Sequence, residues 1–161
     1  MFEKITYTGL HHLAVGRVGE YWTKIALTFN GLDVYTTEVD NKGIDFVVRS
    51  SNGRYFDIQV KSVRSPSTSY VFISKEGEWH EEKLRENLYL ALVIITDYQA
   101  PKLYLIPSTA WKQESDILKS NGEGENGRKK YSKPEWGINL SEKNMSHLAE
   151  FEVENQVEKM K

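Results

Sequence analysis

The feature that most constrains the fold is a nearly continuous apolar run near the middle of the chain, Leu88–Thr96. A strand that is apolar at almost every position has no face to present to water, so its sheet must be covered on both sides. Half-exposed sheets alternate apolar and polar residues instead. The run therefore predicts a central strand in a layered fold, with other elements packed against both of its faces.

The segments around this strand predict a mixture of helices and strands. Apolar residues at helical spacing predict a helix over about Leu13–Asn30 that ends at Gly31. Its expected core-facing stripe consists of Val18, Trp22, Ile25, Ala26 and Phe29. Further strands are expected at Asp33–Glu38, Gly43–Arg49, Tyr55–Val63, Tyr70–Ser74 and Lys102–Ile106, and helices at Glu81–Asn87, around Trp111 and from Ser141 onward. This order predicts an α/β layer fold with a mixed central sheet flanked by helices.

Length and composition favour one domain spanning residues 1–161. A chain of 161 residues with 39% hydrophobic residues can bury a sizeable core. We expect that core over about residues 10–118, a loop over 119–134 and a C-terminal strand and helix over 135–158. The chain has no cysteine, which excludes disulfides and zinc–thiolate sites, and it has no apolar run near the ~20 residues of a membrane span. These features predict a cytoplasmic protein without a membrane partner.

A hairpin between Gly43–Arg49 and Tyr55–Lys61 is the most informative stretch for function. Both segments alternate apolar and polar residues, so the turn length decides which side chains share a face. A two-residue turn would mix apolar and polar side chains on each face. A three-residue turn, Ser51–Gly53, with its glycine in the left-handed conformation, pairs Phe46 with Ile58 and separates the two faces. The apolar pattern therefore selects the three-residue turn.

The same register gathers polar side chains on the other face. It sets Asp45 opposite Gln59, with Cβ atoms about 5 Å apart, and Lys61 two residues further along. Mg²⁺ prefers hard oxygen ligands, so Asp45, the Gln59 side-chain oxygen and the Val60 carbonyl are candidate ligands, and Mn²⁺ is an alternative metal. Lys61 would orient or deprotonate an attacking water. An ordinary surface ion pair between Asp45 and Lys61 is the competing interpretation.

Three short runs resemble the PD-(D/E)XK phosphodiesterase superfamily: Gly16–Glu20, Gly43–Asp45 and Ile58–Ser62. The likeness is greatest to the archaeal Holliday-junction resolvase branch and covers about residues 10–63 by motif. It implies a restriction-endonuclease-like three-layer core, Mg²⁺-dependent hydrolysis and a nucleic-acid substrate.

By matching positions, the resemblance implies roles for three residues. Glu20 corresponds to the family's helix acid, Asp45 to its central metal ligand and Lys61 to its catalytic lysine. Gln59 stands where the family more often has a carboxylate, which makes this chain a QxK variant. Asp57 lies one pleat away from Gln59 on the same face and is a candidate to contribute through a water. On a helical wheel Glu20 lies opposite the predicted core-facing stripe, so its place at the site is an open question.

A basic segment provides candidate contacts to a nucleic-acid backbone. It contains Arg128, Lys129, Lys130 and Lys133, in a region rich in glycine. The net charge of −2 is low for a nucleic-acid-binding domain. Screening over about 8–10 Å nevertheless makes the local patch the relevant quantity. A solvated loop is the alternative interpretation of this segment.

Histidines and tryptophans have ordinary structural explanations. His11 and His12 are expected in a loop or first helical turn, with a general-acid role as the alternative. His80 precedes two glutamates and is expected to cap a helix. The four tryptophans are expected to pack in the core.

The sequence thus predicts a metal-dependent nuclease, with DNA a more natural substrate than RNA. Two other hypotheses stay open: a binding module of the same fold with a weakened site, and an interaction component of a mobile-element or defence system. A homodimer is also considered, because cutting both strands of a duplex or junction needs two sites in symmetric relation.

Overall fold

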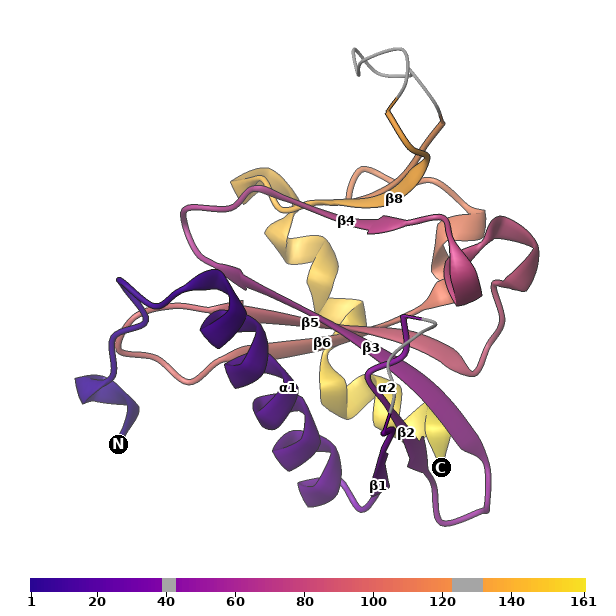
Figure 1. The fold of residues 1–161 in the computed structure, drawn as a ribbon, viewed down its shortest axis with the longest axis horizontal. Helices are drawn as coiled ribbons and strands as arrows, with labels where there is room; N and C mark the ends of the chain where they lie inside the picture. The colour runs from indigo at the N-terminus through magenta and orange to yellow at the C-terminus, as the bar shows by residue number, and fades with distance from the viewer. Residues whose placement is uncertain (39–42, 123–131) are drawn as a thin grey trace.

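The computed structural model of the chain describes residues 1–38, 43–122 and 132–161 (Figure 1). The α-helices are α1 (His12–Phe29) and α2 (Val153–Met160). The strands are β1 (Asp33–Thr36), β2 (Phe46–Arg49), β3 (Tyr55–Arg64), β4 (Tyr70–Ser74), β5 (Leu88–Ile95), β6 (Lys102–Pro107), β7 (Leu118–Asn121) and β8 (Glu135–Asn139). Short 3₁₀ segments are η1 (Phe2–Lys4), η2 (Gly77–Trp79), η3 (Glu81–Lys83), η4 (Ser108–Lys112) and η5 (Glu142–Phe151).

The main sheet has five strands in the order β1-β2-β3-β5-β6. Its β3–β5 pair is parallel and its other pairs are antiparallel, so the sheet is mixed, as predicted. All eight residues of β5 are buried. Alternate side chains of β5 enter two separate cores, Leu88 and Leu90 on one face and Tyr89 and Ala91 on the other. The prediction of a central strand without an exposed face is confirmed.

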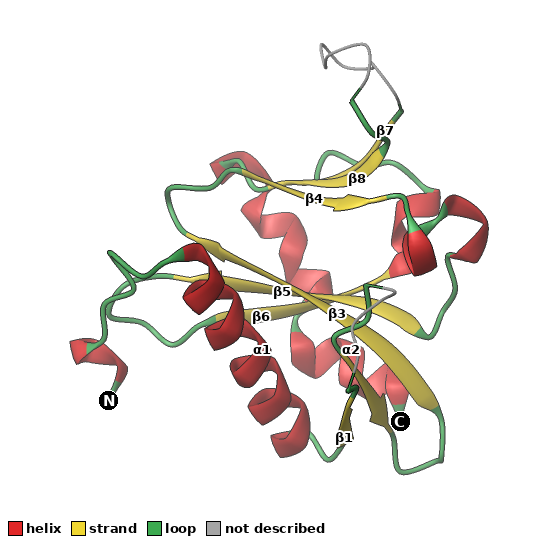
Figure 2. Cartoon of the chain, viewed as in Figure 1, coloured by secondary structure: helices red, strands yellow, loops and turns green. Residues whose placement is uncertain are grey.

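Two different layers cover these faces (Figure 2). Helices α1 and α2 contribute to the core that contains Tyr89. The other face packs under a three-stranded sheet of order β4-β8-β7, together with the buried indoles of Trp79, Trp111 and Trp136. The prediction that tryptophans serve as packing residues is confirmed for these three. In the described part of the chain, no helix is long and apolar enough to cross a membrane.

The prediction of which face of α1 enters the core was correct in part, because Val18, Trp22 and Ala26 pack against the core whereas Ile25 and Phe29 do not. The buried positions are Val15, Gly19, Thr23 and Leu27, whereas Ile25 is 47% and Phe29 is 87% exposed. Small residues at the contact let the helix backbone approach the sheet closely. The Thr23 hydroxyl donates to the Gly19 carbonyl at 2.8 Å, which satisfies the hydroxyl within the helix.

The closest approach is between α1 and β3. A Cβ atom added at Gly19 would lie 1.7 Å from the Ser62 Oγ and 2.9 Å from the Ser62 Cβ. A side chain larger than hydrogen is therefore excluded at position 19 unless the helix moves away from β3. The helix ends at Phe29, followed by Gly31 with a φ of +80°, as the sequence predicted.

Other elements differ from the predictions in kind or extent. The helix expected over Glu81–Asn87 is only the 3₁₀ turn η3, and the first part of the C-terminal helix is the 3₁₀ segment η5. The predicted loop over residues 119–134 includes most of β7, while its residues 123–131 lie outside the described ranges. His80 caps η3 as expected, since its Nδ1 accepts from the Glu82 N–H at 3.4 Å.

We expect Gly19→Ala to destabilise the fold by about 1–3 kcal/mol, because the new methyl group collides with Ser62. Gly16→Ala is the matched control: nothing lies within 4 Å of a Cβ there. It should stabilise the helix by up to about 1 kcal/mol. Chemical denaturation of both variants measures the difference. Adding Ser62→Gly to Gly19→Ala should restore most of the loss, and equal stabilities of the two single variants would contradict the close contact.

Candidate functional site

The predicted hairpin register is present. Phe46 pairs with Ile58 and Val48 with Phe56, and these four side chains are at most 1% exposed. The Ser50 N–H donates to the Arg54 carbonyl at 2.9 Å, which closes a three-residue turn whose Gly53 has a φ of +85°. Burial of the apolar face therefore fixes the register, and the polar residues of β3 lie on the opposite face.

The ladder between β2 and β3 changes at Asp45, just before β2 begins. The Asp45 N–H donates to the Ile58 carbonyl at 2.9 Å, and the Asp45 Oδ2 accepts from the Val60 N–H at 2.5 Å. These two partners are the residues on either side of Gln59. The carboxylate of Asp45 thus takes the place that a strand carbonyl would occupy, just before β2 begins to pair with β3. It is hydrogen-bonded to the residue that follows Gln59, but Asp45 is not among the described residues that line the cleft beside Gln59.

Gln59 and Lys61 line a cleft of about 330 Å³ between β3, β4 and η2. The remaining lining residues are Gly43, Phe72, Ile73, Ser74, Glu76, Gly77 and Trp79. Among the described residues, the buried Gln59 Oε1 accepts no hydrogen bond and the buried Trp79 Nε1 donates none. Buried polar atoms are nearly always paired, so an unpaired oxygen at a cleft is a candidate ligand for a cation or a water.

These residues fit a magnesium ion in part. The Asp45 carboxylate and the unpaired Gln59 oxygen are hard oxygen donors on neighbouring backbone positions, as Mg²⁺ prefers. Across residues 1–38, 43–122 and 132–161, however, no three His, Cys, Asp or Glu side chains form a group that could hold a metal. A metal here would therefore be held by one carboxylate, one amide oxygen, and backbone carbonyls or water molecules. Such a set of ligands carries only one formal negative charge.

Glu20 lies on the other side of β3. Its helix packs on the face of β3 that carries Ser62, whereas Gln59 and Lys61 alternate to the opposite face. The Glu20 Oε2 accepts from the Arg17 Nη1 at 2.8 Å, and the Glu20 side chain is 27% exposed. Within the described ranges, we find no hydrogen bond or ion pair from Glu20 to Asp45, Gln59 or Lys61.

Asp57, the other carboxylate on this face of β3, pairs with Arg85. The Arg85 Nη1 also lies 3.0 Å from the Glu78 Oε2. Burial opposes ionisation of Glu78, but Lys83 and Arg85 outweigh it and hold its pKa below the usual value. Asp57 is therefore part of a separate ion-pair network beside the cleft.

The predicted basic segment falls mostly outside the described residues. Arg128, Lys129 and Lys130 lie there, and only Lys133 is described. The Lys133 Nζ lies 2.8 Å from the Glu76 Oε1, and this ion pair raises the pKa of Lys133 and lowers that of Glu76. Because Glu76 lines the cleft, Lys133 lies at the cleft rim.

Two residues of the cleft were not identified from the sequence. Trp79 is buried and contacts Trp111 edge to face, with ring centroids 5.8 Å apart. Phe72 is 56% exposed between the buried Val71 and Ile73. The alternation in β4 was the available signal for Phe72, whereas no local pattern indicated that Trp79 would reach the cleft.

His11 caps α1 by accepting from the Leu13 N–H at 3.4 Å, which is an ordinary first-turn role.

Comparisons with known proteins address the fold. No protein-family model matches the chain, and no curated protein matches it. The structure is similar to Hjc, a Holliday junction resolvase from the archaeal hyperthermophile Archaeoglobus fulgidus, with a TM-score of 0.50 and 12% identity over 89% of this chain and 95% of that one. A bacterial homing endonuclease matches with a TM-score of 0.42 and 14% identity, over 63% of this chain and 68% of that one. The chain has a restriction-endonuclease-like fold, as predicted.

We expect Gln59→Glu to tighten Mn²⁺ or Mg²⁺ binding by about tenfold or more, because a second carboxylate would raise the ligand charge beside Asp45. Calorimetric titration of the purified protein measures the affinity. The control Asp57→Glu keeps the charge in the neighbouring ion-pair network and should leave the affinity unchanged. Equal metal affinities for wild type and Gln59→Glu would exclude Gln59 as a ligand.

Proposed function

We propose that this chain is a metal-dependent endonuclease that hydrolyses phosphodiester bonds in nucleic acid, with DNA favoured over RNA. The observation that carries the proposal is the junction of β2 and β3, where the Asp45 carboxylate accepts from the N–H of Val60, the residue between Gln59 and Lys61, and where the unpaired Gln59 oxygen and Lys61 line one cleft. The restriction-endonuclease-like fold agrees with it, although a fold by itself does not determine a reaction.

Each proposed residue has a distinct task. When bound, Mg²⁺, or Mn²⁺ in its place, would supply the positive charge that polarises the scissile phosphate. Asp45 and Gln59 would hold the ion, with the Val60 carbonyl as a further ligand. The Val60 N–H anchors the Asp45 carboxylate and so limits its rotation. Lys61 would position or deprotonate the attacking water and offset the charge that builds on the phosphate. Glu20 is proposed as the helix acid, acting after its carboxylate leaves Arg17.

The substrate backbone is proposed to follow the rim of the cleft. Lys133 lies there with Glu76, and a phosphate group would compete with Glu76 for its ammonium group. Arg128, Lys129 and Lys130, a few residues earlier in the chain, are proposed as further phosphate contacts. Such contacts would make binding salt-dependent and insensitive to sequence.

A binding module of the same fold is the second candidate. It is favoured by the low ligand charge, since Gln59 is neutral and Asp57 is already paired with Arg85. Metal titration separates the two candidates. Nucleic-acid binding without measurable Mg²⁺ or Mn²⁺ affinity at Asp45 supports the binding module.

We expect purified protein to cleave branched, duplex or single-stranded DNA in Mg²⁺ or Mn²⁺, and chelation of the metal should stop it. Lys61→Ala and Asp45→Asn should each lower the cleavage rate by about 100-fold or more. Asp45→Asn keeps an oxygen that can accept from the Val60 N–H, so the hairpin should stay intact. Gel-based cleavage assays and thermal melting measure both effects.

The matched control for Lys61→Ala is Lys119→Ala. Lys119 is a partly exposed strand lysine on β7, away from β3, so this variant should cleave at the wild-type rate. Cleavage that persists in both Lys61→Ala and Asp45→Asn would show that these residues do not carry the reaction.

A further inference from the structure

Two aromatic side chains lie on the outer face of the three-stranded sheet, next to the candidate site. In β4, Val71 and Ile73 enter the core, so Tyr70 and Phe72, which alternate with them, lie on the opposite face. Tyr70 is 37% and Phe72 is 56% exposed. Phe72 also lines the cleft that contains Lys61. The two rings therefore continue the cleft onto the surface of the sheet.

Gly137 determines how the Tyr70 ring lies. It is the residue of β8 that pairs with Phe72, and a Cβ atom added there would lie 2.6 Å from the Tyr70 Cζ. The Tyr70 hydroxyl accepts from the Asn121 Nδ2 at 2.6 Å and donates to the Glu135 Oε1 at 3.3 Å. These partners belong to β7 and β8, so the ring lies along the sheet and turns one face to the solvent. Because Gly137 has no side chain, nothing on β8 covers Phe72 at the paired position.

Flat aromatic faces of this kind stack with nucleobases of any sequence. Tyr70 and Phe72 are two residues apart on one strand, so their Cα atoms are separated by about 6.7 Å. In a duplex the bases of one strand follow each other every ~3.4 Å and cover each other's faces. Bases that stack on these two rings must therefore be separated from their neighbours, as they are in a single strand.

The charges near the two rings nearly balance. Lys61 lines the cleft and Lys133 lies at its rim, 76% exposed. Glu76 is paired with Lys133, and Glu135 accepts from the Tyr70 hydroxyl. The ammonium groups are available for phosphates, but the aromatic faces have to supply a large part of the affinity. Stacking releases no counterions, so the part of the affinity that depends on the rings should hardly change with salt.

We infer that Tyr70 and Phe72 form a stacking surface for unpaired bases of DNA and guide a single strand toward Lys61. The inference rests on the proposed function for the identity of the polymer and for the cutting end at Lys61. The base next to the scissile phosphate stacks on Phe72, and a neighbouring base stacks on Tyr70. The substrate is then a single strand, a flap or an unpaired arm of a branched DNA, and a continuous duplex binds less tightly.

The test measures binding in EDTA, which removes the metal and so separates binding from cleavage. Fluorescence anisotropy compares a labelled single-stranded oligodeoxynucleotide with the blunt duplex of the same sequence, and the single strand should bind more tightly. Phe72→Leu stays apolar but removes the flat ring. It should weaken single-strand binding by about fivefold or more, at low and at high salt, and duplex binding by less than about twofold. Phe72→Trp should keep the single-strand affinity.

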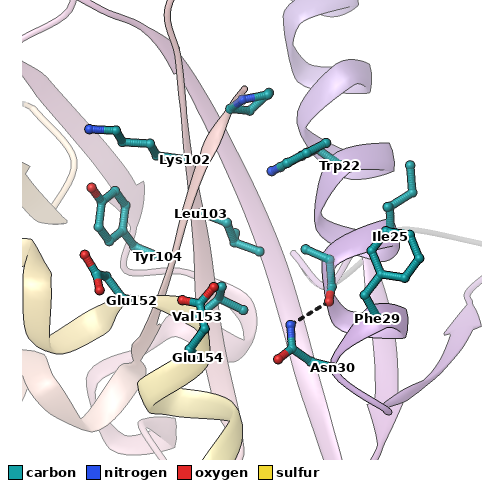
Figure 3. A pocket seen from close by; sticks show the side chains of 12 residues that line it. Trp22, Ile25, Phe29, Asn30, Lys102, Leu103, Tyr104, Glu152, Val153 and Glu154 are labelled. Carbon is teal, nitrogen blue, oxygen red and sulfur yellow. Dashed lines mark hydrogen bonds between the residues drawn. The ribbon is translucent and has the colours of Figure 1, made fainter. Parts of the chain in front are cut away.

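The matched control is Phe29→Leu. Phe29 is 87% exposed and lines a separate groove of about 500 Å³ between α1 and β6 (Figure 3). This variant should bind both forms of DNA like the wild type. Because Phe29 and Phe72 are both exposed, neither replacement should change the melting temperature.

The outcomes separate this inference from the proposed nuclease. Binding of the single strand that depends on Phe72, in a protein that never cleaves, would support the inference and contradict the nuclease. Equal affinities for single strand and duplex would overturn the inference, even if the protein cleaves duplex DNA. It would also be overturned if Phe72→Leu bound the single strand as tightly as Phe29→Leu, or if the wild type bound neither form.

Discussion

The structure depends on one constraint: β5 has no side that can face water. Its alternate side chains enter two cores, so each face of the main sheet must be covered by another layer. On one face the cover consists of α1 and α2, and on the other it is the three-stranded sheet with its buried indoles. The parallel pairing of β5 with β3 then fixes the strand that carries Gln59 and Lys61 against the most deeply buried element of the fold. The candidate site is therefore built on rigid backbone.

The hairpin could be predicted from the sequence because one physical rule decides it. A slip of one residue would move Phe46 and Ile58 to the polar face, so burial selects a single register and turn length. That register predicts Asp45 near Gln59, but it does not predict that the ladder changes at Asp45 or that the Asp45 carboxylate bonds the Val60 N–H. The unpaired state of the Gln59 oxygen does not follow, because it depends on β4 and η2, which approach from elsewhere in the chain. The three-stranded sheet was equally unpredictable, since β4 and β8 pair across more than sixty residues, and nothing local indicates the partner.

The orientation of α1 shows where reasoning from hydrophobicity fails. The most buried positions are Val15, Gly19, Thr23 and Leu27, and of the expected stripe only Ile25 and Phe29 are exposed. A pattern read by side-chain size selects Ile25 and Phe29, whereas packing on the sheet favours Gly19 and Thr23, because small side chains allow the backbones to approach.

The close contact at Gly19 also limits what Glu20 can do. At Gly19, next to Glu20, the backbone of α1 lies so close to Ser62 that a Cβ would not fit. A closer approach of α1 to β3 at this point is therefore excluded, so the Glu20 carboxylate would change its partner by rotation about the χ angles of its own side chain. Whether Glu20 takes part in the chemistry is then decided by a competition between rotamers, one of which is held in place by Arg17.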